Sequence, residues 1–261
     1  MPSENVATSE PIDRRARKRE ARRDHLLDLA LDIVDDHGVD GLTMAALADA
    51  GDYATASLYT YFSSRSALMA ALQERALVVL ARVGTESEAA WDRARAAGDR
   101  VDLATSALAK LCAFSDLFLD APVRHRREFR LQQQLLVTPG VEDVDDAGGV
   151  VPAALHVLAQ PQRLLAAAAE VGAMQPGQPM VGPLGETVDA SFARTLAWVV
   201  ALNGALLTDG LVTGLPTTGE ALGSQLTDTL LVGWGADAAV LASARALSAD
   251  WARAARSEAE A

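Results

Sequence analysis

Apolar residues recur at helical spacing along most of this 261-residue chain, and no stretch shows the strict alternation that is typical of a half-buried β-strand. Residues 139–149 and 172–186 interrupt the pattern with closely spaced glycine, proline and acidic residues, which indicates loops. Pro161 is expected to kink or divide the helix that contains it. The pattern predicts an all-α fold with helices near 24–37, 43–51, 54–62, 65–97, 100–120, 122–137, 151–171, 187–212, 219–233 and 236–257.

Composition excludes several classes of protein. Half of the residues are hydrophobic and 22% are charged, so the chain is not globally disordered. The longest unbroken apolar run, residues 196–202, is far too short to cross a bilayer, and the N-terminus has no signal-peptide pattern. We therefore expect a cytoplasmic protein without membrane contact. Cys112 is the only cysteine, which excludes intrachain disulfides and cysteine-rich metal sites.

The charge is distributed unevenly along the chain. A formal net charge of −12 argues, taken alone, against nucleic acid as a partner. However, residues 14–23 hold seven basic residues and one acidic residue, whereas residues 79–261 hold 14 basic and 22 acidic residues. We interpret residues 1–23 as a disordered basic arm, which would attract a polyanion to one end of the molecule. A merely solvated tail is the alternative, and this segment alone favours neither.

Three short predicted helices over 24–62, with a break at Gly51-Asp52, describe a helix-turn-helix. In such a unit the second helix crosses the phosphate backbone and the third lies in the major groove. The third helix is rich in hydroxyl groups, while Leu58 and Phe62 are spaced to anchor it inward. Hydroxyl groups suit contacts with phosphates and base edges.

At these residues the chain resembles the TetR family of bacterial transcriptional regulators. The resemblance is carried by Gly41 to Ala48, by Leu58-Tyr59-Thr60-Tyr61-Phe62 and by Ser64 to Leu68, and the run from His25 to Gly38 is similar to the family's first helix. It covers roughly residues 20–70. The resemblance implies a DNA-binding domain over residues 24–70 and a larger helical domain over residues 71–261, which dimerises and holds an inducer.

The resemblance also implies roles for individual residues. Thr43 would cap the second helix and contact a phosphate, and Arg65 would bind phosphate. The arm would reach along the backbone or into the minor groove. The expected DNA-binding residues are Arg17, Lys18, Arg22, Thr43, Thr55, Ala56, Ser57, Tyr59, Thr60, Tyr61 and Arg65.

Two departures from the family pattern occur. In the third helix, Thr55 and Ala56 stand where a basic side chain is common in the family, and the turn also differs. The left-handed position falls on Asp52 instead of glycine, and Ala54 replaces a serine-type cap of the third helix. Both departures are expected to loosen the docking on DNA, and the basic arm is expected to offset the missing charge.

The last helices carry two apolar stripes, which predict a homodimer through residues 187–212 and 219–233. The alternative is that both stripes pack inside the monomer. The stripes consist of Trp198, Val199, Leu202 and Leu206, and of Leu222, Leu226, Leu230 and Leu231.

A small, hydrophobic effector is expected in a pocket of the larger domain, lined by aromatic and apolar side chains with a few polar groups to orient the ligand. The candidates are Phe114, Phe118, Phe129, Trp198 and Leu202, with Arg130, Gln134 and Asn203 as the polar groups.

The sequence gives little support for catalysis. It contains no nucleophile elbow, phosphate-binding loop or zinc-binding helix motif, so no enzyme activity, metal or cofactor is expected. His125 and Glu128 stand one turn apart among arginines, which indicates surface salt bridges. The aspartates on the first helix are interpreted as a solvated face, because one straight helix cannot wrap a hard cation.

The sequence thus predicts a homodimeric repressor that binds a palindromic operator in double-stranded DNA and is released by a small molecule. One alternative is an α-helical enzyme or small-molecule-binding protein whose basic arm is incidental. Another is a DNA-binding regulator governed by a protein partner.

Overall fold

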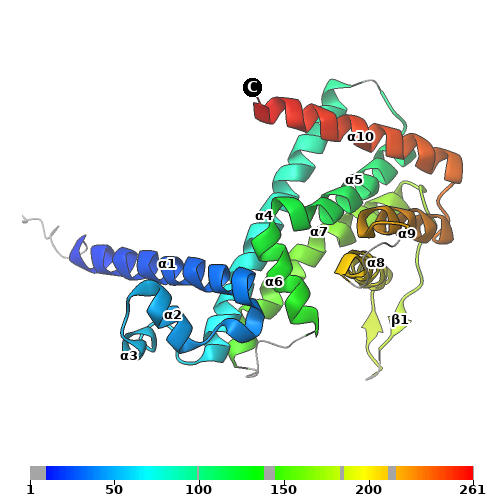
Figure 1. The fold of residues 1–261 in the computed structure, drawn as a ribbon. Coiled ribbons are helices and arrows are strands. Elements are labelled where there is room, and N and C mark those ends of the chain that lie inside the picture. The colour runs from blue at the N-terminus through cyan, green and yellow to red at the C-terminus, as the bar shows by residue number, and fades with distance from the viewer. Residues whose placement is uncertain (1–9, 99, 138–144, 183–184, 211–215, 261) are drawn as a thin grey trace, which may run out of the picture. The chain divides into compact units, whose positions relative to one another are not determined.

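The computed structural model of the chain is built almost entirely of helices, as predicted (Figure 1). It describes residues 10–98, 100–137, 145–182, 185–210 and 216–260. The chain divides into two compact units. Met1–Leu77 and Arg127–Ala153 form the first unit, and Val78–Arg126 and Ala154–Ala261 form the second.

The first unit contains α1 (Glu10–Gly41), α2 (Met44–Gly51), α3 (Thr55–Leu58), the start of α4 (Arg65–Ala97) and nearly all of α6 (Arg126–Val137). A 3-10 turn, η1 (Asp146–Gly148), also belongs to it. Its core gathers side chains from α1, α2, α3, α4 and α6. The largest fully buried ones are Leu26, Leu27, Leu42, Leu47, Leu58, Leu68, Met69, Leu72 and Leu131.

The beginning of α1 corrects the sequence prediction. Residues 10–23, expected as part of a disordered arm, are helical, and residues 1–9 lie outside the described part of the chain. The composition explains this, because arginine, lysine, alanine and glutamate all favour helix and Pro11 stands in the first turn, where proline is tolerated. Gly38, with φ 74°, interrupts the regular helix at the predicted position.

The position of α6 also differs from the prediction, which placed everything after residue 70 in one domain. Leu131 of α6 is fully buried in the core of the first unit. Gln134 accepts a hydrogen bond from the Val39 amide at 3.0 Å, just after the break in α1. α6 is therefore part of the packing that supports α1.

The second unit contains the rest of α4, α5 (Leu103–Arg124), most of α7 (Val150–Glu170), α8 (Ala190–Leu207), α9 (Gly219–Gly233) and α10 (Ala238–Glu260). The turn η2 (Thr208–Gly210) follows α8. Within this unit α10 packs along α5, and α9 packs against both α5 and α8. The core includes Leu108, Cys112, Phe114, Trp198, Leu202, Leu231 and Trp251.

Prolines fall inside two helices of this part of the chain. α5 runs through Pro122 and ends at Arg124, and its C-cap His125 leaves the helical region with φ −127° and ψ 44°. α7 continues through Pro161, which the sequence analysis expected to kink or divide it. Next to Pro161, the buried Gln160 donates a hydrogen bond to the Gly84 carbonyl at 2.8 Å, so α7 is held against α4 at this point.

A small β-hairpin lies between α7 and α8, where the sequence analysis expected no strand. β1 (Met180–Val181) pairs antiparallel with β2 (Thr187–Val188), and Gly182 donates to the Glu186 carbonyl at the turn. An exposed two-stranded ribbon has only edge strands, which tolerate neighbouring prolines such as Pro179. The all-α class is unchanged.

Among the described residues, one helix, α8, has the length and composition of a membrane span, with a mean hydropathy of 1.4. Its 18 residues rise only about 27 Å, slightly less than the apolar thickness of a bilayer. One face of α8, including Trp198 and Leu202, is buried in the core of the second unit. The apolar composition is therefore used, in part, for packing within the protein.

Candidate nucleic-acid interface

The turn between α2 and α3 has the backbone geometry that the sequence predicts. Thr43 is the N-cap of α2, and its Oγ1 accepts a hydrogen bond from the Ala46 amide at 3.0 Å. Asp52 is left-handed, with φ 56° and ψ 45°, and its amide donates to carbonyls of α2. Ala54 makes no side-chain cap for α3. The turn therefore has both of the features by which it departs from the family pattern.

α3 is a single turn, shorter than the predicted helix over 54–62, and the chain continues in turns through Tyr61. Leu58 is fully buried and Phe62 is nearly so, which fixes the inner side of this segment. Tyr61 is half-buried and packs against the core of the first unit. The outer side is an exposed surface that contains Thr55, Ala56, Ser57, Tyr59 and Thr60, with Tyr59 52% exposed.

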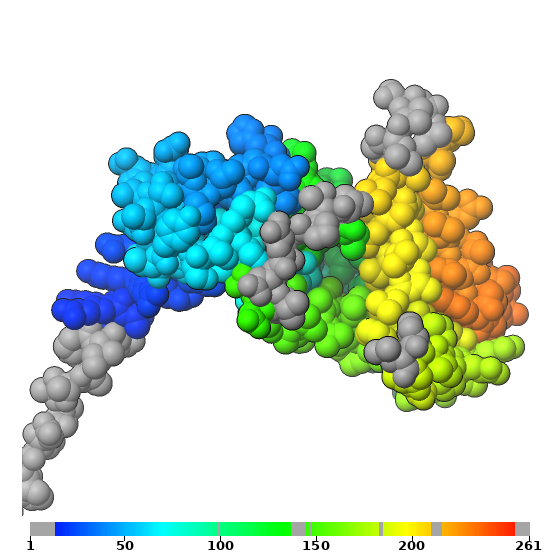
Figure 2. Space-filling view, turned by 90° about the horizontal axis from the view of Figure 1, so that it is seen from below, coloured from blue at the N-terminus to red at the C-terminus, as the bar shows by residue number. Residues whose placement is uncertain are grey.

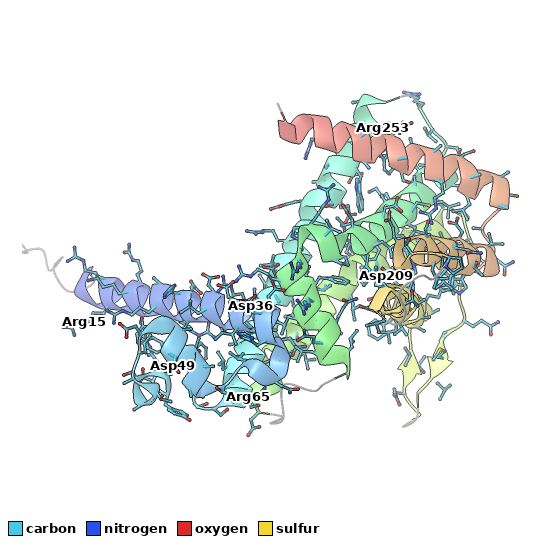
Figure 3. The ribbon with its side chains drawn as sticks, viewed as in Figure 1. Arg15, Asp36, Asp49, Arg65, Asp209 and Arg253 are labelled. Atoms are coloured by element: carbon cyan, nitrogen blue, oxygen red, sulfur yellow. The ribbon has the colours of Figure 1, made fainter. Side chains whose placement is uncertain are left out.

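Arg65 has a structural role that the sequence analysis did not foresee. Its Nε donates to the Leu42 carbonyl at 2.7 Å, and its Nη2 donates to the Val39 carbonyl at 2.8 Å. The side chain is half-buried and ties the start of α4 to the end of α1 and to Leu42, which lies between α1 and α2 (Figure 3). Two of its five N–H groups are thereby engaged, and three remain for a phosphate.

Residues 14–23, the basic part of α1, form an exposed surface of the first unit, shown in the darkest blue in Figure 2. The predicted contacts Arg17, Lys18 and Arg22 lie on it. Two arginines that the sequence analysis did not select connect it to the segment after α3. Arg19 donates to the Thr60 carbonyl at 2.8 Å, and the Arg23 guanidinium lies 5.5 Å from the centroid of the Phe62 ring.

A periodic signal for these two arginines was present in the sequence. Arg15, Arg19 and Arg23 stand four residues apart, in phase with the buried Leu26 and Leu27. A four-residue spacing places side chains on one face only in a helix, and the prediction treated this segment as disordered.

The aspartates of α1 are not simply a solvated face. Asp28 pairs with Arg75 of α4, and on α6 Arg127 pairs with Asp32 at 2.6 Å and Arg130 with Asp35 at 3.1 Å. Most of these groups are partly exposed, so each pair contributes at most about 1 kcal/mol. Their effect is to orient α6 on α1. In the part of the chain that the structure describes, no three histidine, cysteine or acidic side chains gather as metal ligands.

Comparison with known families identifies this unit. Residues 26–72 match the family model of bacterial regulatory proteins, tetR family. The match contains the Thr43 cap, the left-handed Asp52, the exposed side of α3 and Arg65. This segment is a TetR-family helix-turn-helix domain. No curated protein sequence matches the chain.

Solved structures share the fold over most of the chain. SmeT, the repressor of the Stenotrophomonas maltophilia multidrug efflux pump SmeDEF, aligns with a TM-score of 0.53 at 17% identity, over 81% of this chain and 89% of its own. RolR in complex with resorcinol aligns with 0.51 at 19% identity, over 89% and 95%. The Bacillus subtilis regulator FadR with stearoyl-CoA aligns with 0.53 at 12% identity, over 80% and 97%. These likenesses show the fold.

Outside the TetR-family domain, five of the predicted pocket residues lie in the second unit. Phe114, Trp198 and Leu202 are buried in its core, where the Phe114 and Trp198 rings have centroids 5.1 Å apart. Phe118 packs against this core, and Asn203 donates to the Val199 carbonyl of its own helix at 2.9 Å.

The other three, Phe129, Arg130 and Gln134, belong to the first unit, so the structure does not assign all eight residues to one unit. Arg130 pairs with Asp35, and Gln134 binds the Val39 amide. Two of the three polar groups predicted to orient a ligand therefore hold α6 on α1. The sequence could not separate the two cases, because both put an arginine and a glutamine on the face of a helix.

A buried polar cluster in the second unit had no signal in the sequence. Thr227 Oγ1 accepts a hydrogen bond from Trp198 Nε1 at 2.9 Å and lies 2.8 Å from Ser115 Oγ. All three side chains are fully buried. The cluster joins α5, α8 and α9 inside the apolar core.

Proposed function

We propose that the protein is a ligand-responsive transcriptional repressor that acts in the cytoplasm and binds a palindromic DNA operator as a homodimer. The observation that carries the proposal is the outer side of α3. There Thr55, Ser57 and Tyr59 are exposed, while the buried Leu58 fixes their orientation from beneath. A short hydroxyl-rich helix held in this way can approach base edges and phosphates closely.

Each α3 would enter a major groove, with Thr43 and the free N–H groups of Arg65 directed at phosphates. Two copies must then stand one helical turn of DNA apart, about 34–36 Å, or a multiple of it. The exposed residues of α3 would read the half-site, and the basic part of α1 would add affinity that does not depend on sequence.

The proposed dimer uses α8 and α9, but not through all the residues that their apolar stripes suggested. Trp198, Leu202 and Leu231 are fully buried within the second unit, so they are not available to a partner. The exposed apolar residues of the two helices are Leu196, Val200, Leu207 and Val232, of which Val200 is 68% exposed. Two such helices from each chain would form a four-helix interface.

The effector is proposed to bind the second unit, whose core is rich in aromatic and aliphatic side chains. Structures of two proteins of the same fold hold resorcinol and stearoyl-CoA. Both ligands have an apolar part, an aromatic ring in one and an acyl chain in the other, which supports an effector with an apolar part. They differ too much in size to name it.

A route from effector to DNA runs along the chain from α5 through His125 to α6. α6 is bound to α1 by Arg127, Arg130 and Gln134. A shift of α5 on effector binding would therefore reach the helix that supports α3. That shift would change the distance between the two α3 helices of the dimer. The affinity for DNA would then fall by the coupling free energy between effector and DNA binding, typically about 1–3 kcal/mol.

The proposal is tested by selecting bound duplexes from a random pool with the full-length protein. An inverted repeat with half-sites one helical turn apart is the expected result. Recovery of no preferred sequence would refute specific DNA binding and favour the alternative of a helical enzyme or binding protein. Recovery of a single half-site would refute the dimer.

A pair of matched variants tests the dimer separately. Val200→Glu is expected to give a monomer in sedimentation measurements and to weaken binding to the inverted repeat. Val123→Glu, at an exposed valine of α5 in the same unit, is expected to leave the dimer unchanged. Equal behaviour of the two variants would contradict an interface on α8.

A further inference from the structure

In the basic part of α1, residues 14–23, several arginines lie together on one face of the helix. Arg15, Arg19 and Arg23 follow one another at intervals of four residues, and Leu26 and Leu27 continue the same face into the core of the first unit. Arg22 lies beside Arg19 on this face by helical rotation, whereas Arg14 lies on another side. Figure 3 shows Arg15 on the side of α1 where α2 and α3 lie.

Two contacts join this face to the end of the recognition segment. The Thr60 carbonyl lies just beyond the C-terminus of α3, where carbonyl groups lack helical partners, and Arg19 supplies a charged donor at 2.8 Å. Arg23 stacks its guanidinium over the ring of Phe62, which is itself anchored in the core. The position of the basic helix and that of the turn after α3 are therefore coupled.

A helix also limits how this segment can meet DNA. With its side chains it is about 10–12 Å wide, whereas the minor groove of B-DNA is about 6 Å wide. The described residues 10–23 therefore do not fit the minor groove as an extended arm would. Residues 14–23 hold seven basic residues and one acidic residue, so the phosphate backbone is the matching partner for this surface.

We propose that residues 14–23 form a preordered phosphate-binding helix that acts as one body with the recognition helix. Arg15 and Arg22 bind phosphates beside the groove that α3 enters, about 10 Å apart along the helix. Arg19 and Arg23 are positioning residues that hold the turn after α3 through Thr60 and Phe62. This inference rests on the proposed function, because it assumes that α3 meets a duplex.

The first test compares adjacent arginines in the full-length protein. Arg15→Ala and Arg22→Ala are each expected to lower the slope of log K against log salt by about 0.9, which is about fivefold in affinity at 0.15 M salt. Arg14→Ala removes the same charge from another side of the helix and is expected to change the slope by less than half as much. Equal slopes for Arg14→Ala and Arg15→Ala would overturn the assignment of the face.

The second test concerns the positioning residue. Arg19→Ala is expected to lower the ratio of operator affinity to random-duplex affinity about tenfold, since the end of α3 loses a charged hydrogen bond. Arg19→Lys keeps a donor for the Thr60 carbonyl and is expected to restore most of that ratio. A purely electrostatic role would weaken both duplexes equally in Arg19→Ala, and this outcome would refute positioning.

The two proposals fail differently. If no operator exists, the proposed function fails and the ratio cannot fall, but the salt slopes on a random duplex still test the phosphate-binding face. If an operator is found and residues 14–23 exchange their amide hydrogens in the free protein as fast as an unfolded peptide, the preordered helix is wrong while the proposed function stands.

Discussion

Replacing Leu131 by alanine is expected to destabilise the first unit, although Leu131 lies on α6, far along the chain from the helix-turn-helix. Its side chain is fully buried among residues of α1 and α4. Truncating a buried leucine costs the transfer free energy of the lost carbons and the cavity left behind, together about 3 kcal/mol. For a cooperative unit of about 100 residues, that corresponds to a fall in Tm of roughly 12–24 °C.

The matched control is Leu136→Ala, on the same helix at a leucine that is 61% exposed, and it is expected to change stability by less than about 0.5 kcal/mol. Intrinsic probes separate the units, because all three tyrosines lie in the first and all four tryptophans in the second. In urea unfolding, the midpoint reported by near-ultraviolet tyrosine signals should fall more for Leu131→Ala than the midpoint reported by tryptophan fluorescence. Similar small changes for both leucine variants would refute the placement of α6 in this core.

Three further predictions concern the turn and the second unit. Asp52→Gly is expected to stabilise the protein by about 0.5–1 kcal/mol in urea unfolding, because the backbone of Asp52 is left-handed. Asp52→Ala should destabilise it for the same reason. An alanine variant more stable than the glycine variant would contradict a φ of 56°. Thr227→Val keeps the shape of the side chain but leaves the Trp198 N–H and the Ser115 hydroxyl without their partner. We therefore expect the free energy of unfolding to fall by about 1–3 kcal/mol. An unchanged urea midpoint would disprove the buried cluster. Burial raises the pKa of Cys112 to about 12. At pH 8 its alkylation by iodoacetamide should therefore be at least about a thousandfold slower in the native than in the urea-unfolded protein. Rapid labelling of the native protein would show that the thiol is accessible.

Local chemistry explains why the helix-turn-helix could be predicted in detail. The Thr43 cap, the left-handed Asp52 and the inward Leu58 each depend on contacts within a few residues, and all three predictions are confirmed. The same holds for the break at Gly38, where φ is positive. The prediction was wrong for residues 10–23, because it gave the high charge density more weight than the good helix propensity of these residues.

The partners of surface groups were much harder to predict. The aspartates of α1 were predicted to form a solvated face, yet Asp32 and Asp35 pair with arginines of α6. Arg130 and Gln134 were predicted as ligand contacts, and in the structure both side chains are bonded to α1. An arginine on a helix face carries no local mark of whether it will meet an acid, a ligand or water. The outcome depends on which helix packs opposite, and that is a long-range property.

By itself, the order of residues determined the all-helical class, the caps and breaks of the first helices and the hydroxyl-rich surface of α3, because each of these follows from backbone preferences and periodicity over one or two turns. Only the tertiary structure decided that α6 completes the first core, that Arg19 and Arg23 contact Thr60 and Phe62 after α3, and which face of α8 stays exposed. These features join residues that are tens of positions apart. Their energies depend on distances that exist only after the helices have packed.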